Sequence, residues 1–359
     1  MKIFFNFIHF KKLYIFFTFL SLINFFFSTV KLEASAFNIK NIEISKPFEI
    51  NFDKNEIIDE GFKKGFDELI SLITTSSDRK KIDKIRINQI KGMIESFSVK
   101  EEKFVNQIYY VNLGVSFNRK KIFNYLENKN IFPSIPKKTK FLFIPIIIDE
   151  KKKDLLIFSN NEFFDKWNGT QKRNHLIEYI LPTEDLEDIK LIKSKYEFIE
   201  SYDFKEIVNK YFLNDSIITL FFKNEDEVRV LSRINFNDKE TLMNQSFLNI
   251  DINNDQKLSS IINELKIIYE DYWKTFNRIN TSIKLPIMIK VNNSENLKLL
   301  KLEKNLKEID LIYDYSVYKF NKDHTFYEII FNGSPDIFLK TMGEKKFNFD
   351  TQNKIWSLQ

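Results

Sequence analysis

The sequence predicts an α+β, or mixed α/β, protein made of two or three small α/β sandwich modules, the last of them ferredoxin-like. Segments with alternating apolar and polar residues, typical of half-buried strands, recur between segments whose apolar residues repeat every three or four positions, typical of amphipathic helices. Apolar residues make up 43 % of the 359 residues, which is enough for more than one core. Two prolines within residues 132–136 mark a linker. We therefore expect modules at residues 37–132, 137–280 and 281–359.

The first 36 residues have the pattern of a secretory signal peptide. Three lysines precede an uncharged run at residues 13–30, and Ala34-Ser35-Ala36 supplies the small-x-small pattern that signal peptidase cleaves. We therefore expect residues 1–36 to be removed and the mature protein to be exported to the periplasm. The alternative is an uncleaved anchor in the inner membrane, because residues 13–30 are just long enough to cross a bilayer of about 30 Å. Membrane contact is expected only through this segment, if it is retained.

The first module is expected to begin with strands and an amphipathic helix. Apolar residues alternate loosely over residues 37–52, where Pro47 marks a break or an edge. Spacings of three and four residues predict a helix at 55–75. The remaining elements are a second helix capped by Ser77-Asp78 and ending near residue 95, a strand at 104–117, and a short helix capped by Asn118 and ending at 126.

The central module is expected to contain a buried strand, several helices and a meander. Residues 141–148 are almost entirely apolar, as in a strand buried on both faces. Residues 256–276 have the helical period that closes the module. Between them we expect strands at 155–158, 176–180, 216–222, 227–236 and 241–250, and helices at 162–167, 183–193 and 204–212.

The third module has the element order of a split βαβ unit. A strand at 285–291 is followed by a helix at 294–309, and the chain then continues with strands at 311–320 and 326–331, a helix at 335–342 and two short strands. This βαββαβ order with an extra strand predicts a ferredoxin-like module.

The composition excludes several classes of function. The absence of cysteine excludes disulfides, thiolate metal sites and a cysteine nucleophile. Of the formal net charge of +5, the leader accounts for three charges through four lysines and one glutamate, which leaves about +2 for the mature chain. Such a charge does not indicate nucleic-acid binding. With seven glycines and no phosphate-binding loop or hydrolase motif, the sequence predicts no cofactor.

An acidic stretch after Pro182 supplies the candidate catalytic residues Glu184, Asp185 and Asp188. On a helix that includes residue 184, three- and four-residue spacing would place Glu184 beside Glu187 and Asp188. Paired carboxylates can act as general acid and base when a cleft shifts their pKa values. The alternative is structural, because acidic side chains at a helix N-terminus are favoured by the helix dipole.

The candidate metal ligands are Asp251, Asn253 and Asp255, whose alternating oxygens resemble the start of a calcium loop. The pattern departs from such a loop at two places. Gln256 occupies the position that requires glycine for a sharp turn, and Ile262 occupies that of the bidentate glutamate. The alternative is an Asx-rich turn that caps the following helix.

Other notable residues are expected to have structural roles. His175 and His324 have no metal-ligand partner at suitable spacing and are predicted to be solvated or lightly hydrogen-bonded. Gly61 and Gly65 predict close packing of their helix. A stripe of aromatic residues at helical spacing indicates a core rather than a ligand platform; it comprises Tyr269, Tyr272, Trp273 and Phe276.

Several segments together resemble the bacterial domain of unknown function 2066 family. The most specific is the stretch 179–188, YILPTEDLED, which is similar to that family's strand ending in Leu-Pro before an acidic helix start. Residues 61–70, 110–126 and 141–148 also carry the resemblance, whereas Phe62 and Lys63 depart from the small residues and arginine typical of the family. The resemblance implies an exported protein and carries over no catalytic residue, because the family has none established.

These observations predict an exported, non-enzymatic envelope protein that acts as a scaffold, assembly factor or binding module. Its partner is expected to be an envelope protein or a cell-wall component. The alternative is a carboxylate-dependent periplasmic hydrolase or lyase that uses the acidic residues near Asp185.

Overall fold

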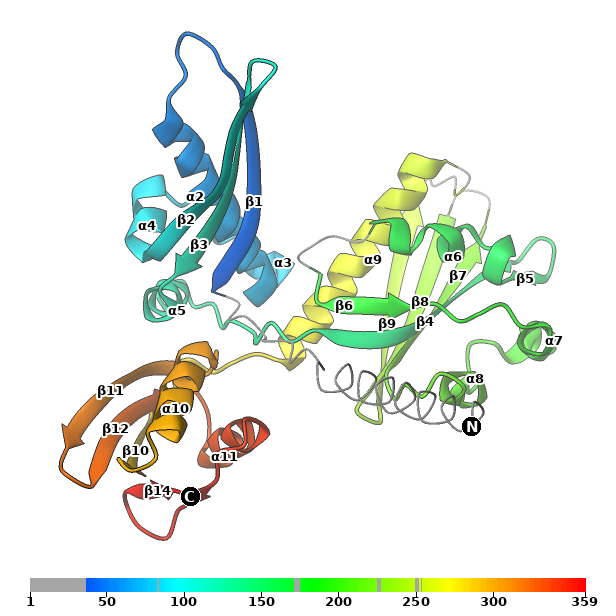
Figure 1. Cartoon of the computed structure of the whole chain (residues 1–359). Helices are drawn as coiled ribbons and strands as arrows, with labels where there is room; N and C mark the ends of the chain where they lie inside the picture. The colour runs from blue at the N-terminus through cyan, green and yellow to red at the C-terminus, as the bar shows by residue number, and fades with distance from the viewer. Residues whose placement is uncertain (1–36, 83, 171–174, 225–226, 249–251, 253) are drawn as a thin grey trace, which may run out of the picture. The chain divides into compact units, whose positions relative to one another are not determined.

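The mixed α+β fold class is as predicted, and in the part of the chain that the structure describes the strands form three β-sheets, at residues 38–117, 139–248 and 285–358 (Figure 1). The computed structural model describes residues 37–82, 84–170, 175–224, 227–248, 252 and 254–359. The predicted leader at residues 1–36 lies outside the described residues. Within the described part of the chain, no helix is both long enough and apolar enough to span a membrane.

The first sheet has the order β1-β3-β2 and is antiparallel. Its strands are β1 (Asn38–Pro47), β2 (Ile94–Val105) and β3 (Ile108–Phe117). Helix α2 (Lys54–Ile73) packs on β1 and β3 as closely as its two glycines allow. A Cβ added at Gly61 would lie 2.3 Å from Leu113 Cδ1, and one at Gly65 would lie 2.8 Å from Ile42 Cδ1. The predicted close packing is therefore confirmed.

Two expectations for this module were wrong. The predicted helix at 77–95 is a pair of short helices, α3 (Ser76–Arg79) and α4 (Ile87–Met93), and the N-cap of α3 is Thr75, two to three residues before the expected cap. The predicted strand at 104–117 is the second half of a hairpin. The chain turns at Asn106 and Gln107, both with positive φ, so β2 occupies residues assigned in part to the helix. Helix α5 (Arg119–Glu127) begins after Asn118, whose side chain accepts from Lys121 N as predicted.

The central sheet has the order β5-β4-β7-β8-β9, and β6 also pairs with β4. Strand β4 is parallel to both β6 and β7, and β7, β8 and β9 form the predicted antiparallel meander. The strands are β4 (Thr139–Asp149), β5 (Asp154–Leu156), β6 (Ile177–Ile180), β7 (Ser216–Lys223), β8 (Glu227–Phe236) and β9 (Lys239–Leu248).

Two hydrophobic clusters lie on opposite faces of this sheet, which explains the continuous apolar run of β4. Phe141, Phe143 and Ile147 join the cluster that contains α9 (Asp255–Phe276), whereas Leu142 and Ile144 join the one that contains residues of α7 (Leu186–Lys193) and α8 (Lys205–Asn209). The shorter helices are α6 (Glu162–Lys166), α7 (Leu186–Lys193), α8 (Lys205–Asn209), and the 3₁₀ turns η1 (Phe158–Asn160), η2 (Asn168–Thr170) and η3 (Tyr196–Phe198).

The third sheet has the order β11-β12-β10-β14-β13 and contains the predicted βαββαβ unit with its extra strand. The short strand β14 is parallel to β10, and β13 pairs on its outer side. The elements are β10 (Leu285–Asn292), α10 (Asn296–Glu308), β11 (Ile312–Phe320), β12 (His324–Phe331), α11 (Pro335–Glu344), β13 (Phe349–Asp350) and β14 (Trp356–Leu358).

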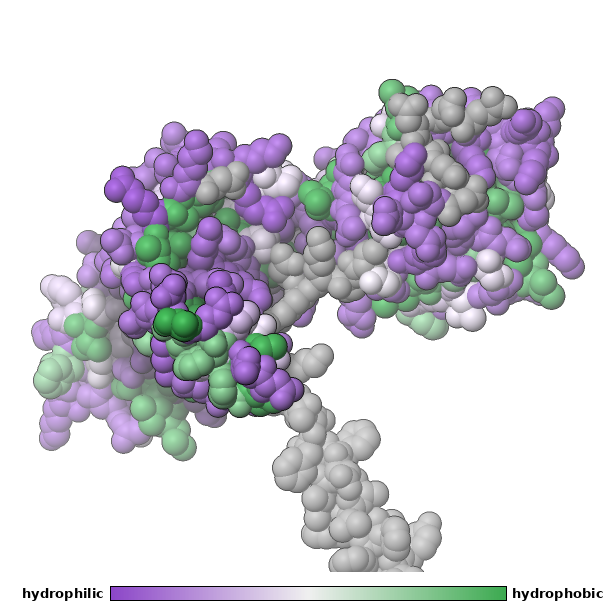
Figure 2. Space-filling model, turned by 90° about the horizontal axis from the view of Figure 1, so that it is seen from above, coloured by the Kyte–Doolittle hydropathy of each residue, from purple (hydrophilic) through white to green (hydrophobic). Residues whose placement is uncertain are grey.

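The predicted linker at 132–136 is hydrogen-bonded rather than loose. Ile279 N donates to Pro133 O at 2.8 Å, and Ile135 N donates to Asn277 O at 3.0 Å. The two connections between modules therefore run side by side. Most apolar side chains lie in the cores, and on the face shown in Figure 2 hydrophilic residues predominate over small separate hydrophobic patches.

Candidate functional site

The acidic candidates had been expected to share one helix face, but the structure does not place Glu184 on the helix. Helix α7 begins at Leu186, three residues later than predicted, because the Asp185 side chain caps it by accepting from Glu187 N at 2.8 Å. Glu184 precedes the helix and is exposed. The side chain of Asp185 is therefore committed to the helix N-terminus, as the structural alternative proposed.

Asp188 has a different environment from the other two acidic candidates, because it is 1 % exposed. Its Oδ1 accepts from Lys210 Nζ at 2.6 Å, and Asp185 Oδ2 lies 3.6 Å from the same nitrogen. The hydrogen bond with Asp188 raises the pKa of Lys210. The second oxygen of Asp188 has no hydrogen-bond partner. The pair joins α7 to the end of α8 and leaves one buried carboxylate oxygen unsatisfied.

Only one of the three candidate calcium ligands lies within the described residues. Asp255 is the first residue of α9 and forms an ion pair with Lys166. Asn254 caps the same helix by accepting from Gln256 N and Lys257 N, as the Asx-turn alternative predicts. Asp251 and Asn253 lie outside the described residues. Where the structure describes the chain, no three His, Asp or Glu side chains are grouped so that they could hold a metal ion.

The sequence analysis missed a row of buried charges on α9, made of Lys266, Glu270 and Lys274. Glu270 Oε1 accepts from Leu176 N at 2.9 Å and from Ile177 N at 2.8 Å, and so holds the start of β6. Burial raises the pKa of Glu270 and lowers that of Lys274. The spacing of four residues between these charges was the signal that could have identified a polar row within the apolar face of the helix.

Lys266 lies among aromatic rings in the same cluster. Its Nζ donates to Trp167 O at 2.6 Å and lies 5.4 Å and 5.3 Å from the ring centroids of Trp167 and Tyr179. Burial lowers the pKa of Lys266 to about 8. Tyr269, next to it on α9, bonds through its hydroxyl to Thr219 and Ser232, and burial raises the pKa of Tyr269 to about 12. These contacts make the row part of the core, although Glu270 Oε2 has no hydrogen-bond partner.

The predicted aromatic stripe is a core feature over part of its length. Tyr269 and Trp273 are buried, in agreement with the prediction, and Tyr272 is partly buried. Phe276 is 54 % exposed, because it lies in the last turn of α9.

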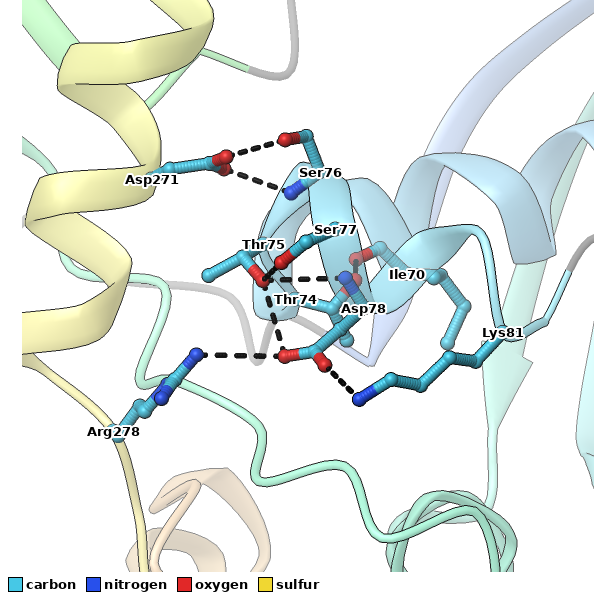
Figure 3. Close-up of polar contacts among 9 residues, drawn as sticks. All are labelled: Ile70, Thr74, Thr75, Ser76, Ser77, Asp78, Lys81, Asp271 and Arg278. Carbon is cyan, nitrogen blue, oxygen red and sulfur yellow. Dashed lines mark hydrogen bonds and ion pairs between the residues drawn. The ribbon is translucent and has the colours of Figure 1, made fainter.

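A second polar cluster joins α3 to α9 and to Arg278, which follows α9 (Figure 3). Ser76 donates to Asp271 through both its backbone nitrogen, at 2.8 Å, and its hydroxyl, at 2.5 Å. Asp78 accepts from Lys81 at 2.7 Å and lies 3.5 Å from Arg278. All these side chains are engaged with one another, so the cluster has the character of a structural contact between modules.

A pocket with a volume of about 290 Å³ lies where the parallel strands β4 and β7 end. Ile148 and Phe222 come from the carboxyl-terminal ends of these strands. The opposite wall is the η3 turn and the residues that follow it. The complete lining is Ile148, Glu150, Tyr196, Glu197, Phe198, Ile199, Glu200, Ser201 and Phe222.

The charged residues that line this pocket are all glutamates. Glu150, Glu197 and Glu200 are exposed at its wall, and Phe198, 73 % exposed, stands between two of them in the chain. At the rim, the guanidinium of Arg229 lies 4.0 Å from the Phe222 ring centroid and 3.5 Å from Glu200. A guanidinium is thus already held at one side by an aromatic ring and a carboxylate.

None of the candidate residues from the sequence lines this pocket. Its walls come from three separate segments, around residues 148–150, 196–201 and 222, so no local motif identifies it. The one available signal was the predicted strand at 141–148, buried on both faces, because the structure pairs it in parallel with β7 and ligands of α/β sheets bind beyond the carboxyl ends of such strands. No protein-family model matches the chain and no curated protein matches it, so the resemblance to the domain of unknown function 2066 family stays a prediction.

Proposed function

We propose that this chain is an exported, non-enzymatic binding protein of the bacterial envelope, and that its ligand carries an alkylammonium or guanidinium group. The observation that carries the proposal is the pocket at the carboxyl ends of β4 and β7, with three glutamates and three aromatic rings in its lining.

The chemistry of the lining supports a cationic ligand. Carboxylates attract a cation from solution, and an aromatic face adds attraction when the cation lies within about 6 Å of the ring centroid. Arg229, held between Phe222 and Glu200, is an example of this recognition within the chain itself. Glu150 and Glu197, for which the described part of the chain shows no ion pair with Arg229, add two further carboxylates to the lining.

Two sources in the envelope would present such a group. One is a lysine or arginine side chain of another envelope protein, and the other is a free amine of a cell-wall peptide. The two share an ammonium or guanidinium on a short apolar stem, which suits a small pocket with Ile148, Phe198 and Ile199 in its walls.

Isothermal titration calorimetry of the protein tests this proposal with two probes, a lysine-containing peptide and a cell-wall stem peptide with a free amine. We expect one of them to bind and its N-acetylated form not to bind. Glu197→Gln and Phe198→Ala should each weaken binding about tenfold, as expected for the loss of about 1.4 kcal/mol. Glu264→Gln, on the exposed side of α9, is the matched control and should leave binding unchanged. Equal binding of the acetylated and free probes would refute the cationic ligand.

The second candidate is a carboxylate-dependent hydrolase or lyase. The observation that favours it is Asp188, which is buried and has one oxygen without a hydrogen-bond partner. Its test is release of soluble fragments from purified cell wall by the wild-type protein and by Asp188→Asn. Release that the variant abolishes, while its circular dichroism spectrum is unchanged, would support the enzyme.

A further inference from the structure

Strand β9 forms an open edge of the central sheet. It pairs with β8 over all ten of its residues without a register shift, and no described strand pairs with its other side. The connecting turn, Asn237-Asp238, has positive φ at both residues, which is the type I′ turn of a two-residue hairpin. In such a hairpin Phe236 and Lys239 form a hydrogen-bonded pair, so every second residue from Lys239 bonds to β8. The N–H and C=O groups of residues 240, 242, 244, 246 and 248 therefore face outward.

This edge lacks the devices that normally prevent strand pairing. Long edge strands are protected by charged side chains, proline or bulges. β2 has five charged residues and two register shifts, and β11 has two of each. β1 has a register shift and ends in Pro47. From Thr241 to the end of β9, by contrast, the strand has no charged residue, no proline and no shift.

Apolar side chains accompany the open backbone groups on both faces of β9. Leu242 and Leu248 are 58 % and 69 % exposed on one face. Met243 and Phe247 are half-buried on the other face, where they pack against the α9 cluster. An added strand would thus bury apolar area as well as form backbone hydrogen bonds.

We propose that β9 pairs with β9 of a second copy of this chain, antiparallel and about a two-fold axis at Gln245. The proposal concerns a surface outside the pocket lining and goes beyond the proposed binding function. The axis joins two central sheets into one continuous sheet.

The sequence of β9 is self-complementary about this axis. Leu242 of one copy lies opposite Leu248 of the other, Met243 opposite Phe247, and Asn244 opposite Ser246. Apolar residues therefore meet apolar residues and polar residues meet polar ones on both faces, and cross-strand pairs of this kind stabilise a sheet. No like charges are brought together within residues 241–248.

The same axis also satisfies the backbone. Each residue whose backbone N–H and C=O groups point away from β8 lies opposite another such residue of the second copy. This gives four hydrogen-bonded pairs and about eight inter-chain hydrogen bonds. A two-fold axis at Asn244 has the same parity, but it places Leu242 opposite Ser246 and Met243 opposite Gln245. The match of side chains therefore favours the axis at Gln245, and it favours a second copy over an unrelated extended segment, for which this symmetry would have no use.

Sedimentation velocity of the natural form of the protein, purified from the cells that make it, gives the first test. We expect twice the mass of the chain at micromolar concentrations. Asn244→Pro removes an outward N–H without touching the bonds to β8 and should shift the protein to the monomer. A wild-type chain that sediments as a monomer throughout, or that carries a segment of another protein on this edge, would overturn the proposal.

Single cysteines then report the register, because the chain contains none of its own. At Gln245→Cys the two cysteines would face each other at a non-hydrogen-bonded pair with Cα atoms about 4.5 Å apart, within the range of a disulfide. At Leu242→Cys, the control on the same strand, the two cysteines would lie about 20 Å apart. We expect mild oxidation to crosslink the first variant and not the second. Equal crosslinking of both, or preferential crosslinking of Asn244→Cys, would overturn the axis.

A charge pair gives a test that does not depend on oxidation. Only the residue on the axis meets its own copy, so Gln245→Lys and Gln245→Glu should each sediment as monomers because of repulsion between like charges. An equimolar mixture of the two should form dimers again. Dimers in either variant alone, or monomers in a mixture whose components each retain the wild-type thermal transition, would contradict the two-fold pairing.

Discussion

Replacing Glu270 by alanine tests whether the buried charges on α9 stabilise the central module. One oxygen of this side chain accepts two backbone N–H groups at the start of β6, at 2.9 and 2.8 Å, and both donor residues are buried. The helix that carries Glu270 packs against the same sheet to which β6 belongs. Loss of the carboxylate therefore leaves these two N–H groups without this acceptor in a dry environment.

The magnitude follows from these two hydrogen bonds. A buried donor left unsatisfied costs about 1–3 kcal/mol, so the two together cost about 2–6 kcal/mol. Part of this is offset, because the pKa of Glu270 is raised by burial and removal of the side chain also removes the cost of burying its charge. We expect Glu270→Ala to lower the free energy of unfolding by about 3 kcal/mol. Glu270→Gln keeps an oxygen in place for both donors and should cost about half as much.

Urea unfolding followed by tryptophan fluorescence measures this loss, because two of the three tryptophans lie in the central module. Trp167 and Trp273 belong to the same hydrophobic cluster as the core face of α9, so their signal follows the central module. Glu264→Ala, at an exposed position of the same helix, should change stability by less than about 0.5 kcal/mol. If Glu270→Ala and Glu264→Ala had equal effects, or if Glu270→Gln were the more harmful change, the hydrogen bonds to β6 would not be the stabilising contribution.

Three further outcomes are expected. The pKa of Lys266 is about 8 in the folded protein, against the ordinary lysine value of 10.5. Between these two values the unfolded state binds more protons, so the free energy of unfolding should rise with pH over this range. Urea titrations at several pH values should show a smaller rise for Lys266→Met. Asp271→Ala removes both hydrogen bonds from Ser76 and should cost about 1–2 kcal/mol, with faster amide exchange at Ser76 by NMR. Gly61→Ala should lower the thermal midpoint, because its Cβ would lie 2.3 Å from a leucine of β3. Gly92→Ala, the control, should leave the midpoint unchanged or raise it, because the space around its Cβ is open.

Elements with a strong hydrophobic period could be predicted from the sequence to within about two residues. Helices α2 and α9 and strand β4 are examples, because each buries a regular set of side chains whose spacing is visible in the sequence. Strand β2 could not be predicted, because all its residues except the first are exposed and its few apolar residues lie between charged ones. Its pairing with β3 also has two register shifts, which interrupt any regular alternation. An edge strand on the surface leaves little trace in a hydrophobic pattern.

The candidate site was harder to predict, because burial rather than residue type determines the role of an ionisable group. Asp185 and Asp188 have the same side chain and are three residues apart, yet one caps a helix and the other is buried against Lys210. The pocket glutamates gave no pattern at all, because the fold brings residue 150 next to residues 197 and 200. Only the tertiary structure distinguishes these cases.

The two proposed contacts of the central module use opposite chemistries, which makes them separable by experiment. The pocket attracts its ligand through the charges of Glu150, Glu197 and Glu200, so salt should weaken binding measured by calorimetry, since exposed charges are screened over about 8 Å at physiological ionic strength. The edge of β9 has no charge after Glu240 and pairs through backbone groups and leucines, so sedimentation should give the same dimer at low and high salt. If salt dissociated the dimer while ligand binding persisted, the two surfaces would have been assigned the wrong chemistry.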